Sequence, residues 1–306
     1  MTRPAPVFIL GCPRSGTLLM SRILGLPDGH YLITEHKNKD VCREDRSGIN
    51  DSKLWWNTFE FEGWNEARDR PAIEEPIYDA GNLQRLKSIY ENLAGNNRLI
   101  VKNPSNLARI PLIREMFPDA IFLFCIRNPW QTITSIAHRG VSGETAHDSF
   151  HLRTKSLAGL ANDFLLRAVH SWAESLGMYL RYRDDHWLSV RYEDIVANPE
   201  AEIGRLYAEL GIDDPASLRK AVAFPRHGAK SCYAINQTYL ASPHRQKINE
   251  LLAENTSAFG YAGDFSSLNI SRFSFYREKF NRRQIKRYLI SLAGDVVDRL
   301  RKATAG

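Results

Sequence analysis

The segment Gly11-Cys-Pro-Arg-Ser-Gly-Thr17 has the composition of a loop that binds phosphate. It follows an apolar run at residues 7–10 that predicts a buried strand, and it precedes apolar positions typical of a helix at 18–24. In a strand–loop–helix unit, backbone N–H groups and the helix N-terminus can hold an anion. The spacing from Gly11 to Gly16 is that of a nucleotide P-loop, so this segment predicts an anion site.

The residues after Gly16 differ from those of a nucleotide kinase. Thr17 and Leu18 stand where a kinase has Lys and the hydroxyl residue that holds Mg²⁺, and positive charge comes from Arg14 inside the loop. A sulfuryl group in transfer carries less charge than a phosphoryl group, so fixed cations and amides can suffice without a metal. The alternative is a tight turn without a ligand, for which Arg, Ser, Gly and Thr together are an unusual choice.

A second anion site is expected after the strand predicted at residues 121–126. Arg127 ends this strand, and Ser135 follows on a helix that begins at Pro129 and runs to about Arg139. Arg139 lies one turn beyond Ser135 on the same helical face. An arginine and a hydroxyl can bind a ribose phosphate through charge-assisted hydrogen bonds. An arginine at a strand end is common. Arg127 and Ser135 therefore indicate an anion site only in combination with the loop at residues 11–17, which precedes them in the chain.

These segments resemble the sulfotransferase family, and Pro13-Arg-Ser-Gly-Thr17 is similar to that family's 5′-phosphosulfate loop. The nearest likeness is to the tyrosylprotein sulfotransferases and related bacterial enzymes, and it spans roughly residues 5–240. The family's usual second threonine is Leu18 here. The resemblance implies 3′-phosphoadenosine-5′-phosphosulfate as co-substrate and no metal.

The resemblance also implies roles for individual residues. The donor's phosphosulfate is expected at Arg14, Ser15, Gly16 and Thr17, and its 3′-phosphate at Arg127 and Ser135. Arg139 matches a basic position of the tyrosylprotein branch. Tyr192 belongs to a Tyr-Glu-Asp segment that is similar to the family's segment after the last strand, and it is expected beside the nucleotide.

Sulfuryl transfer needs a base for the acceptor's proton and a cation for the leaving oxygen. Glu35 ends a predicted strand and resembles the family's glutamate, while His36 is the rival base. Neighbouring strand residues point to opposite faces, so only one of them is expected in the site, and an ordinary polar strand end stays open. Lys102 follows a strand at 99–101 and resembles the family's lysine near the bridging oxygen; a surface lysine is the alternative.

Strands and helices alternate along the chain, which predicts an α/β fold of the P-loop NTPase type, with a central parallel sheet covered by helices in three layers. Further helices are expected at 82–93, 104–116, 158–183, 200–210 and 216–223, and a strand at 187–190. We expect one sulfotransferase domain at 1–270 and a basic helical tail at 271–306. Residues 40–80 predict an insertion on the acceptor side, and 225–245 a lid. Trp55, Trp56 and Trp64 could stack on an acceptor ring or pack internally.

The net charge of +6 is concentrated at the C-terminus, because residues 271–303 carry +7 and the rest of the chain −1. This distribution argues against a nucleic-acid-binding domain. The tail could lie on an anionic membrane, dock a partner, or pack on its own domain or a second subunit. No apolar run approaches the ~20 residues of a membrane span, and no export signal is recognised, so a cytoplasmic location is expected. The four cysteines show no metal-binding spacing and are expected to be reduced.

Two other functions remain as alternatives. A P-loop kinase or NTPase would require ATP and Mg²⁺, and the residues after Gly16 argue against it. A non-catalytic member that binds the nucleotide or a partner is left open by Leu18. The acceptor is not specified by these residues: a peptide tyrosine, a carbohydrate, a lipid and a small molecule all fit.

Overall fold

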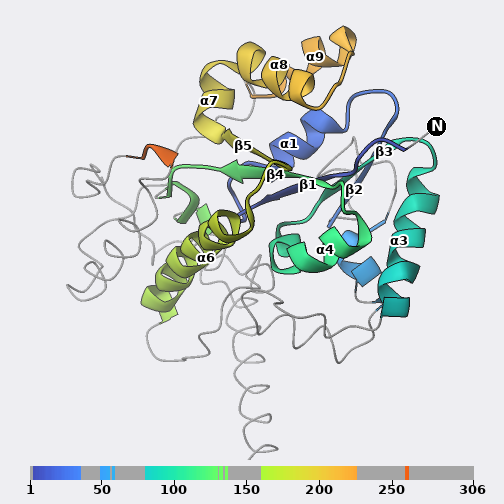
Figure 1. Cartoon of the computed structure of the whole chain (residues 1–306). Helices are drawn as coiled ribbons and strands as arrows, with labels where there is room; N and C mark the ends of the chain where they lie inside the picture. Colours follow the sequence, from blue (N-terminus) through green and yellow to red (C-terminus); the bar gives the residue numbers. More distant parts are fainter. Residues whose placement is uncertain are drawn as a thin grey trace, which may run out of the picture.

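The computed structural model describes residues 3–35, 49–55, 57–58, 80–129, 131–133, 135–136, 160–225 and 259–261. Five strands of this part form one parallel sheet in the order β2-β3-β1-β4-β5 (Figure 1). The strands are β1 (Val7–Gly11), β2 (His30–Thr34), β3 (Arg98–Lys102), β4 (Ile121–Ile126) and β5 (Trp187–Arg191). All of the predicted strands are present.

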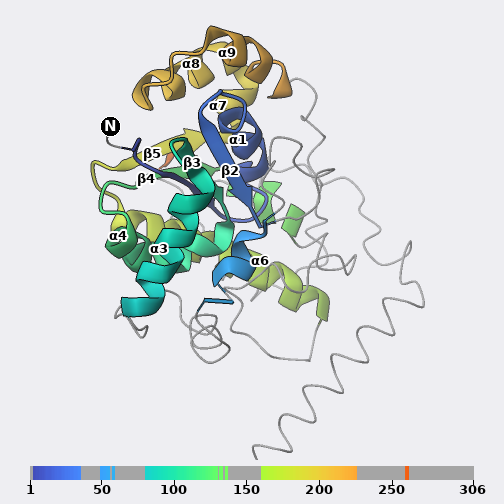
Figure 2. The same ribbon diagram turned by 90° about the vertical axis from the view of Figure 1, so that its right-hand side faces the viewer.

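Helices cover both faces of the sheet, as Figures 1 and 2 show. One face packs against α1 (Thr17–Leu24), α7 (Tyr192–Ala197), α8 (Pro199–Glu209) and α9 (Pro215–Ala221). The other packs against α3 (Ala80–Ala94), the 3₁₀ helix η1 (Pro104–Arg109), α4 (Ile110–Met116) and α6 (Leu160–Tyr182). The predicted three-layer α/β architecture is confirmed.

The position of strand β1 in the sheet explains why its sequence is a continuous apolar run. Val7 and Ile9 belong to the core beneath α1 and α8, whereas Phe8 and Leu10 belong to the core beneath α3, α4 and α6. All four side chains are fully buried. Because successive residues of a strand face opposite sides, a strand covered on both faces must be apolar throughout.

Two details of the predicted helices were wrong. The single helix expected at 104–116 is divided into η1 and α4, because Pro111 has no N–H to continue the helical ladder and instead sits in the first turn of α4. The side chain of Asn103 caps η1 by accepting a hydrogen bond from the Ser105 N–H at 3.0 Å. Helix α7 was not predicted, because six residues are too few to show a helical period.

The topology places a crevice at the carboxyl end of β1. The chain leaves β1 into α1 on one face, but it leaves the neighbouring β3 into η1 and α4 on the other face. Loops that depart in opposite directions from adjacent strands open a binding crevice beyond the strand ends. The loop at residues 11–17 and Arg127 follow strands at this edge, and Lys102 is the last residue of β3.

Part of the predicted insertion at 40–80 is integrated with the sheet edge. Asn50 forms a parallel bridge with Thr34 at the end of β2, and Asp51 and Trp55 are buried. Trp55 packs beneath the guanidinium of Arg109, which lies 4.6 Å from its ring centre, so this tryptophan is a core residue. Trp56 and Trp64, the proposed lid beyond Pro225 and the tail at 271–306 lie outside the described residues. No helix in the described ranges is long and apolar enough to cross a bilayer.

Candidate active site

The loop between β1 and α1 depends on two glycines with positive φ. Gly11 has φ 143°, and a Cβ there would lie 2.4 Å from the carbonyl oxygen of Cys125. Gly16 has φ 102°, and a Cβ there would lie 2.8 Å from Cδ2 of Tyr192. Only glycine allows both the conformation and these close approaches. The loop therefore fits tightly between β4 and the start of α7.

Arg14 is the only non-glycine residue with positive φ, at 75°, in the part of the chain that the structure describes. This conformation is unfavourable for an arginine, and such strain concentrates at functional sites. It is supported from the neighbouring strand, because Arg127 donates a hydrogen bond from Nη1 to the carbonyl oxygen of Arg14 at 3.4 Å. The loop is thereby held to the end of β4.

Ser15 supplies the clearest sign of a ligand in this loop. Its side chain is 1% exposed, and its Oγ has no hydrogen-bond partner among the described residues. A buried hydroxyl without a partner costs about 1–3 kcal/mol, and a bound anion would satisfy it. The N-terminal turn of α1, which starts at Thr17, points its backbone N–H groups toward the same loop. The loop therefore fits an anionic group.

The two predicted anion sites meet at Arg14. Its Nε donates a hydrogen bond to Oγ of Ser135 at 3.0 Å, although 121 positions separate the two residues in sequence. Arg127 lies on the same side, with Nε and Nη2 donating to Oε1 of Gln131 at 3.1 and 3.0 Å. Two guanidinium groups and one hydroxyl are thus gathered in one small region, an arrangement suited to phosphate oxygens.

Tyr192, the first residue after β5, lies beside Arg127 at the site. The guanidinium of Arg127 lies 4.4 Å from the centre of its ring, in a cation–π contact. The neighbouring Glu193 is structural, because it accepts hydrogen bonds from the Asn128 N–H and the Tyr261 hydroxyl, both at 2.8 Å. The Tyr-Glu-Asp segment therefore places one aromatic ring against the site and ties the ends of β4 and β5 together.

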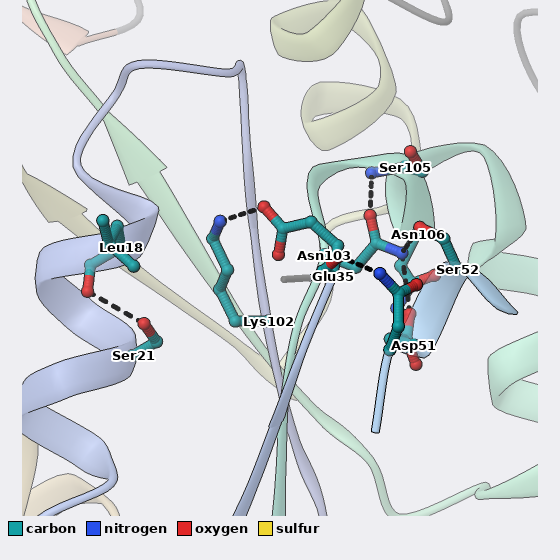
Figure 3. A network of polar contacts seen from close by, with 10 residues as sticks. Leu18, Ser21, Glu35, Asp51, Ser52, Lys102, Asn103, Ser105 and Asn106 are labelled. Carbon is teal, nitrogen blue, oxygen red and sulfur yellow. Dashed lines mark hydrogen bonds and ion pairs between the residues drawn. The ribbon is translucent and has the colours of Figure 1, made fainter. Parts of the chain in front are cut away.

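Glu35 and Lys102 form an ion pair at the ends of β2 and β3 (Figure 3). Their side chains are 17% and 4% exposed, so the pair is largely removed from water. The backbone joins them as well, because the Glu35 N–H donates to the Lys102 carbonyl at 3.2 Å. Lys102 pairs in register with Ile9 of β1, which places this pair beside the anion-binding loop.

Sequence reasoning missed a buried polar cluster behind this ion pair. Asp51 is fully buried and accepts hydrogen bonds from the Tyr90 hydroxyl and from the side-chain amides of Asn103 and Asn106. Burial raises the pKa of the Asp51 carboxyl above its ordinary value, while its hydrogen bonds and the charge of Arg109 oppose this rise. The only signal in the sequence is the pair of asparagines that follows Lys102.

The cysteines near the loop are buried thiols. Cys12 and Cys125 are 3% and 1% exposed. Burial raises the pKa of Cys12 to about 12 and also raises that of Cys125, although the charge of Lys102 acts to lower the latter. Both thiols therefore stay protonated at neutral pH, and both are free cysteines, in agreement with the expectation that they are reduced.

Some predicted site residues cannot be placed. Arg139 and the rival base His36 lie outside the described residues. The described ranges bring together the other predicted residues at the carboxyl edge of the sheet: Arg14, Ser15, Gly16, Thr17, Glu35, Lys102, Arg127, Ser135 and Tyr192. Within these ranges, no group of three or more His, Cys, Asp or Glu side chains is arranged to hold a metal ion.

The structure is a P-loop-like α/β fold that gathers Arg14 and Arg127 at the carboxyl edge of its sheet, beside the ion pair of Glu35 and Lys102. The sequence model of the Sulfotransferase family matches residues 6–216, and the chain belongs to that family. It is accordingly an enzyme that transfers sulfuryl groups.

Individual relatives agree with this assignment. An omega-hydroxy-beta-dihydromenaquinone-9 sulfotransferase of Mycobacterium bovis is 26% identical over 301 residues, covering 84% of this chain and 75% of that protein. The protein-tyrosine sulfotransferase A of Caenorhabditis elegans is 29% identical over 212 residues, covering 67% of this chain and 50% of that protein. The crystal structure of sulfotransferase STF9 from Mycobacterium avium shares the fold, with a TM-score of 0.52 at 15% identity over 86% of this chain and 78% of that one.

Proposed function

We propose that this enzyme takes its sulfuryl group from 3′-phosphoadenosine-5′-phosphosulfate and needs no metal for the transfer. The observation that supports this most strongly is the contact between Arg14 of the loop and Ser135 of the second anion site. A donor with phosphate groups at both its 5′ and 3′ ends requires two anion sites at a short separation. One loop alone would suit any nucleotide, whereas two joined sites favour a nucleoside bisphosphate.

Each residue has a role in this proposal. The phosphosulfate is held by Arg14, Ser15, Gly16 and Thr17, in part through the unpartnered hydroxyl of Ser15. The 3′-phosphate is held by Arg127 and Ser135, with Arg139 as a further cation. The ring of Tyr192 lies against the nucleotide. Leu18 leaves the second hydroxyl of the family's loop missing, and the backbone N–H groups of α1 substitute for it.

The chemistry is assigned to the ion pair. Glu35 accepts the proton of the acceptor's hydroxyl or amine, as the acceptor's oxygen or nitrogen forms its bond to sulfur. The bond between sulfur and the bridging oxygen breaks, and Lys102 stabilises the negative charge left on that oxygen. Because the two side chains contact each other, neither charge is buried alone, which would be costly. His36 is the alternative base.

The acceptor remains the least specified part of this function. The relatives are named for a menaquinone derivative and for protein tyrosine, which are chemically distant from each other. We propose an acceptor with a hydroxyl or amine, drawn from peptides, carbohydrates, lipids or small molecules. We also propose that the chain acts in the cytoplasm without binding nucleic acid, and that the tail at 271–306 mediates peripheral membrane binding or self-association.

Calorimetry with adenosine 3′,5′-bisphosphate tests the donor assignment. We expect binding without added metal, weaker binding of adenosine 5′-phosphate, and no competition from ATP with Mg²⁺. Tight binding of ATP with Mg²⁺ and no heat from the bisphosphate would establish the kinase alternative instead.

Transfer itself can be measured without knowing the acceptor. The enzyme is incubated with donor carrying radioactive sulfur and a metabolite extract, and labelled products are identified by mass spectrometry. Glu35→Gln should retain bisphosphate binding and lose at least about 100-fold in transfer rate, because the base is removed. The exposed Glu209, paired with Arg205, supplies the control Glu209→Gln, which should leave transfer unchanged. Binding without transfer by the wild-type enzyme would support the non-catalytic alternative.

A further inference from the structure

The short segment Asn50-Asp51-Ser52 forms hydrogen bonds with the chain at Glu35 and directly after Lys102, and we call it the 50–52 bracket. The side-chain amide of Asn50 donates to the carbonyl oxygen of Glu35. One residue further on, the carboxylate of Asp51 accepts a hydrogen bond from the Asn103 side chain at 2.7 Å (Figure 3). Asn103 is the residue directly after Lys102, so the bracket contacts the backbone at Glu35, directly after β2, and the side chain of the residue that follows β3.

These contacts close a ring. The Glu35 N–H donates to the Lys102 carbonyl, and Lys102 is joined by a peptide bond to Asn103. Asn103 donates to Asp51, which is joined by a peptide bond to Asn50, and Asn50 donates back to Glu35. Every link of this ring is a peptide bond or a hydrogen bond. A ring of this kind leaves the ends of β2 and β3 little freedom to shift relative to each other.

Asp51 is the member of the ring whose burial needs an explanation. An isolated buried carboxylate is expensive, and packing alone would be served better by an apolar residue. Its two oxygens have separate partners: Oδ1 accepts from the Tyr90 hydroxyl of α3, and Oδ2 accepts from Asn103 at 2.7 Å and Asn106 at 3.2 Å. Arg109 supplies the compensating positive charge nearby and donates to Oδ1 of Asn106 at 2.7 Å.

We propose that the 50–52 bracket sets the position of Glu35 relative to Lys102, and that Asp51 is a positioning residue for sulfuryl transfer. This inference rests on the proposed roles of Glu35 and Lys102 in the reaction. Asp51 does not touch the reacting atoms and acts through Asn103 on Lys102. A base and a cation that must act on the two ends of one in-line transfer need a fixed separation, and small displacements are costly in rate.

Three variants separate positioning from general stability. Asp51→Asn keeps the shape but removes the charge and one accepting oxygen, so the single oxygen that remains cannot accept from both Tyr90 and the amides of Asn103 and Asn106, and a neutral oxygen holds Asn103 more weakly than the carboxylate does. Asn50→Ser can still cap the helix that follows, where Oδ1 of Asn50 now accepts from the Lys53 N–H at 3.0 Å, but it is too short to reach Glu35. Tyr90→Phe is the matched control, since it removes the Oδ1 contact and leaves Asn103 bound to Oδ2.

The first readout is kinetic, at a fixed amount of acceptor extract and varied donor. Asp51→Asn and Asn50→Ser should lower the maximal transfer rate by about 10- to 100-fold and leave the donor's KM and bisphosphate binding within about twofold. Tyr90→Phe should lower the thermal midpoint while keeping the maximal rate within about twofold. In the Glu35→Gln background, Asp51→Asn should cause little further loss, because the group it positions is already absent.

The second readout does not depend on the acceptor. The rate at which an amine-acylating reagent modifies Lys102, followed by peptide mass spectrometry, should rise at least about fivefold in Asn50→Ser and Asp51→Asn but not in Tyr90→Phe. Lys87 serves as the internal reference. An unchanged Lys102 rate in both bracket variants, or an equal loss of transfer in Tyr90→Phe, would overturn the positioning role. If Glu35→Gln itself transfers normally, the assignment of the base fails instead.

Discussion

Nε of Arg14 donates a hydrogen bond to Oγ of Ser135 at 3.0 Å, so the loop after β1 and the helix after β4 meet at one contact. Ser135 is only 5% exposed. Its hydroxyl can accept a hydrogen bond from Arg14 while it donates its own proton to a ligand oxygen. Arg14 has a positive φ of 75°, and its side chain reaches the helix that follows β4. Under the proposed function, this contact couples the recognition of two phosphate groups that lie at opposite ends of one nucleotide.

Removal of the Ser135 hydroxyl should weaken recognition of the 3′-phosphate selectively. We expect Ser135→Ala to bind adenosine 3′,5′-bisphosphate about 10-fold more weakly, since one hydrogen bond to a charged group is lost. Its affinity for adenosine 5′-phosphate should change by less than about twofold, because that ligand lacks the 3′ group. Calorimetry with both ligands checks this. An equal loss for the two would mean that Ser135 acts only by orienting Arg14.

Alanine substitutions at three glycines should lower the unfolding free energy by different amounts, according to which atoms the new Cβ contacts. Gly29 has φ 81° and open space, so Gly29→Ala should cost about 1 kcal/mol in unfolding free energy, the cost of the conformation alone. Gly16→Ala adds a contact with the ring of Tyr192, which can shift, and should cost about 2–3 kcal/mol. Gly11→Ala would overlap a backbone oxygen and should cost more than about 4 kcal/mol.

Urea unfolding measures the unfolding free energy of all three variants. A double variant then tests why Gly16→Ala is destabilised. Tyr192→Leu should recover part of the loss in Gly16→Ala, because the smaller side chain makes room for the methyl group. Additive losses in the double variant would show that the backbone conformation at Gly16, not the ring of Tyr192, sets the cost.

The strands, and the loop that joins β1 to α1, could be predicted from the sequence because their information is local. Val7 to Leu10 is apolar without a break, and the loop residues that follow are contiguous, so residue type and spacing suffice. The strand order is not local: β1 pairs with β3 and β4 through contacts that no short window contains. The division of 104–116 into two helices does have a local signal in the sequence, which is Pro111.

The 50–52 bracket could not have been predicted in this way. Asp51 contacts Tyr90 and Asn103, which lie 39 and 52 positions further along the chain. Asn50 and Asp51 stand in a stretch with little periodicity, which resembles a solvent-exposed loop when it is read alone. Only the pairing of β2 with β3 brings them behind the ion pair, so their function appears at the level of tertiary contacts.

The buried cysteines should be protected from alkylation in the folded protein. Cys12 and Cys125 are almost fully buried, and their raised pKa values keep them as thiols at neutral pH. We expect iodoacetamide to modify both only as fast as the core opens, and to modify them fully in urea. Peptide mass spectrometry over a time course checks this. Rapid native labelling of Cys12 alone would reveal opening of the loop independently of the sheet.

His30, at the start of β2, should make folding stability depend on pH. Its Nδ1 lies 2.7 Å from the Leu24 carbonyl oxygen, which requires a proton on this nitrogen. Burial lowers the pKa of His30 below its ordinary value of 6.5, and the charge of Arg98 lowers it further, while the contact with Leu24 opposes the shift. The folded protein therefore keeps the ring neutral at a pH where the unfolded chain begins to bind a proton.

The sign follows from linkage: the unfolded state binds more protons as the pH falls through about 6.5, so the stability that His30 contributes is present above this value and is lost below it. Thermal unfolding of the wild-type protein should show a declining midpoint between about pH 7.5 and 5. His30→Asn keeps an N–H donor for Leu24 but does not titrate, so it should show a smaller decline over this window. Parallel pH profiles of the two proteins would contradict the assignment to His30 and would require another titrating group.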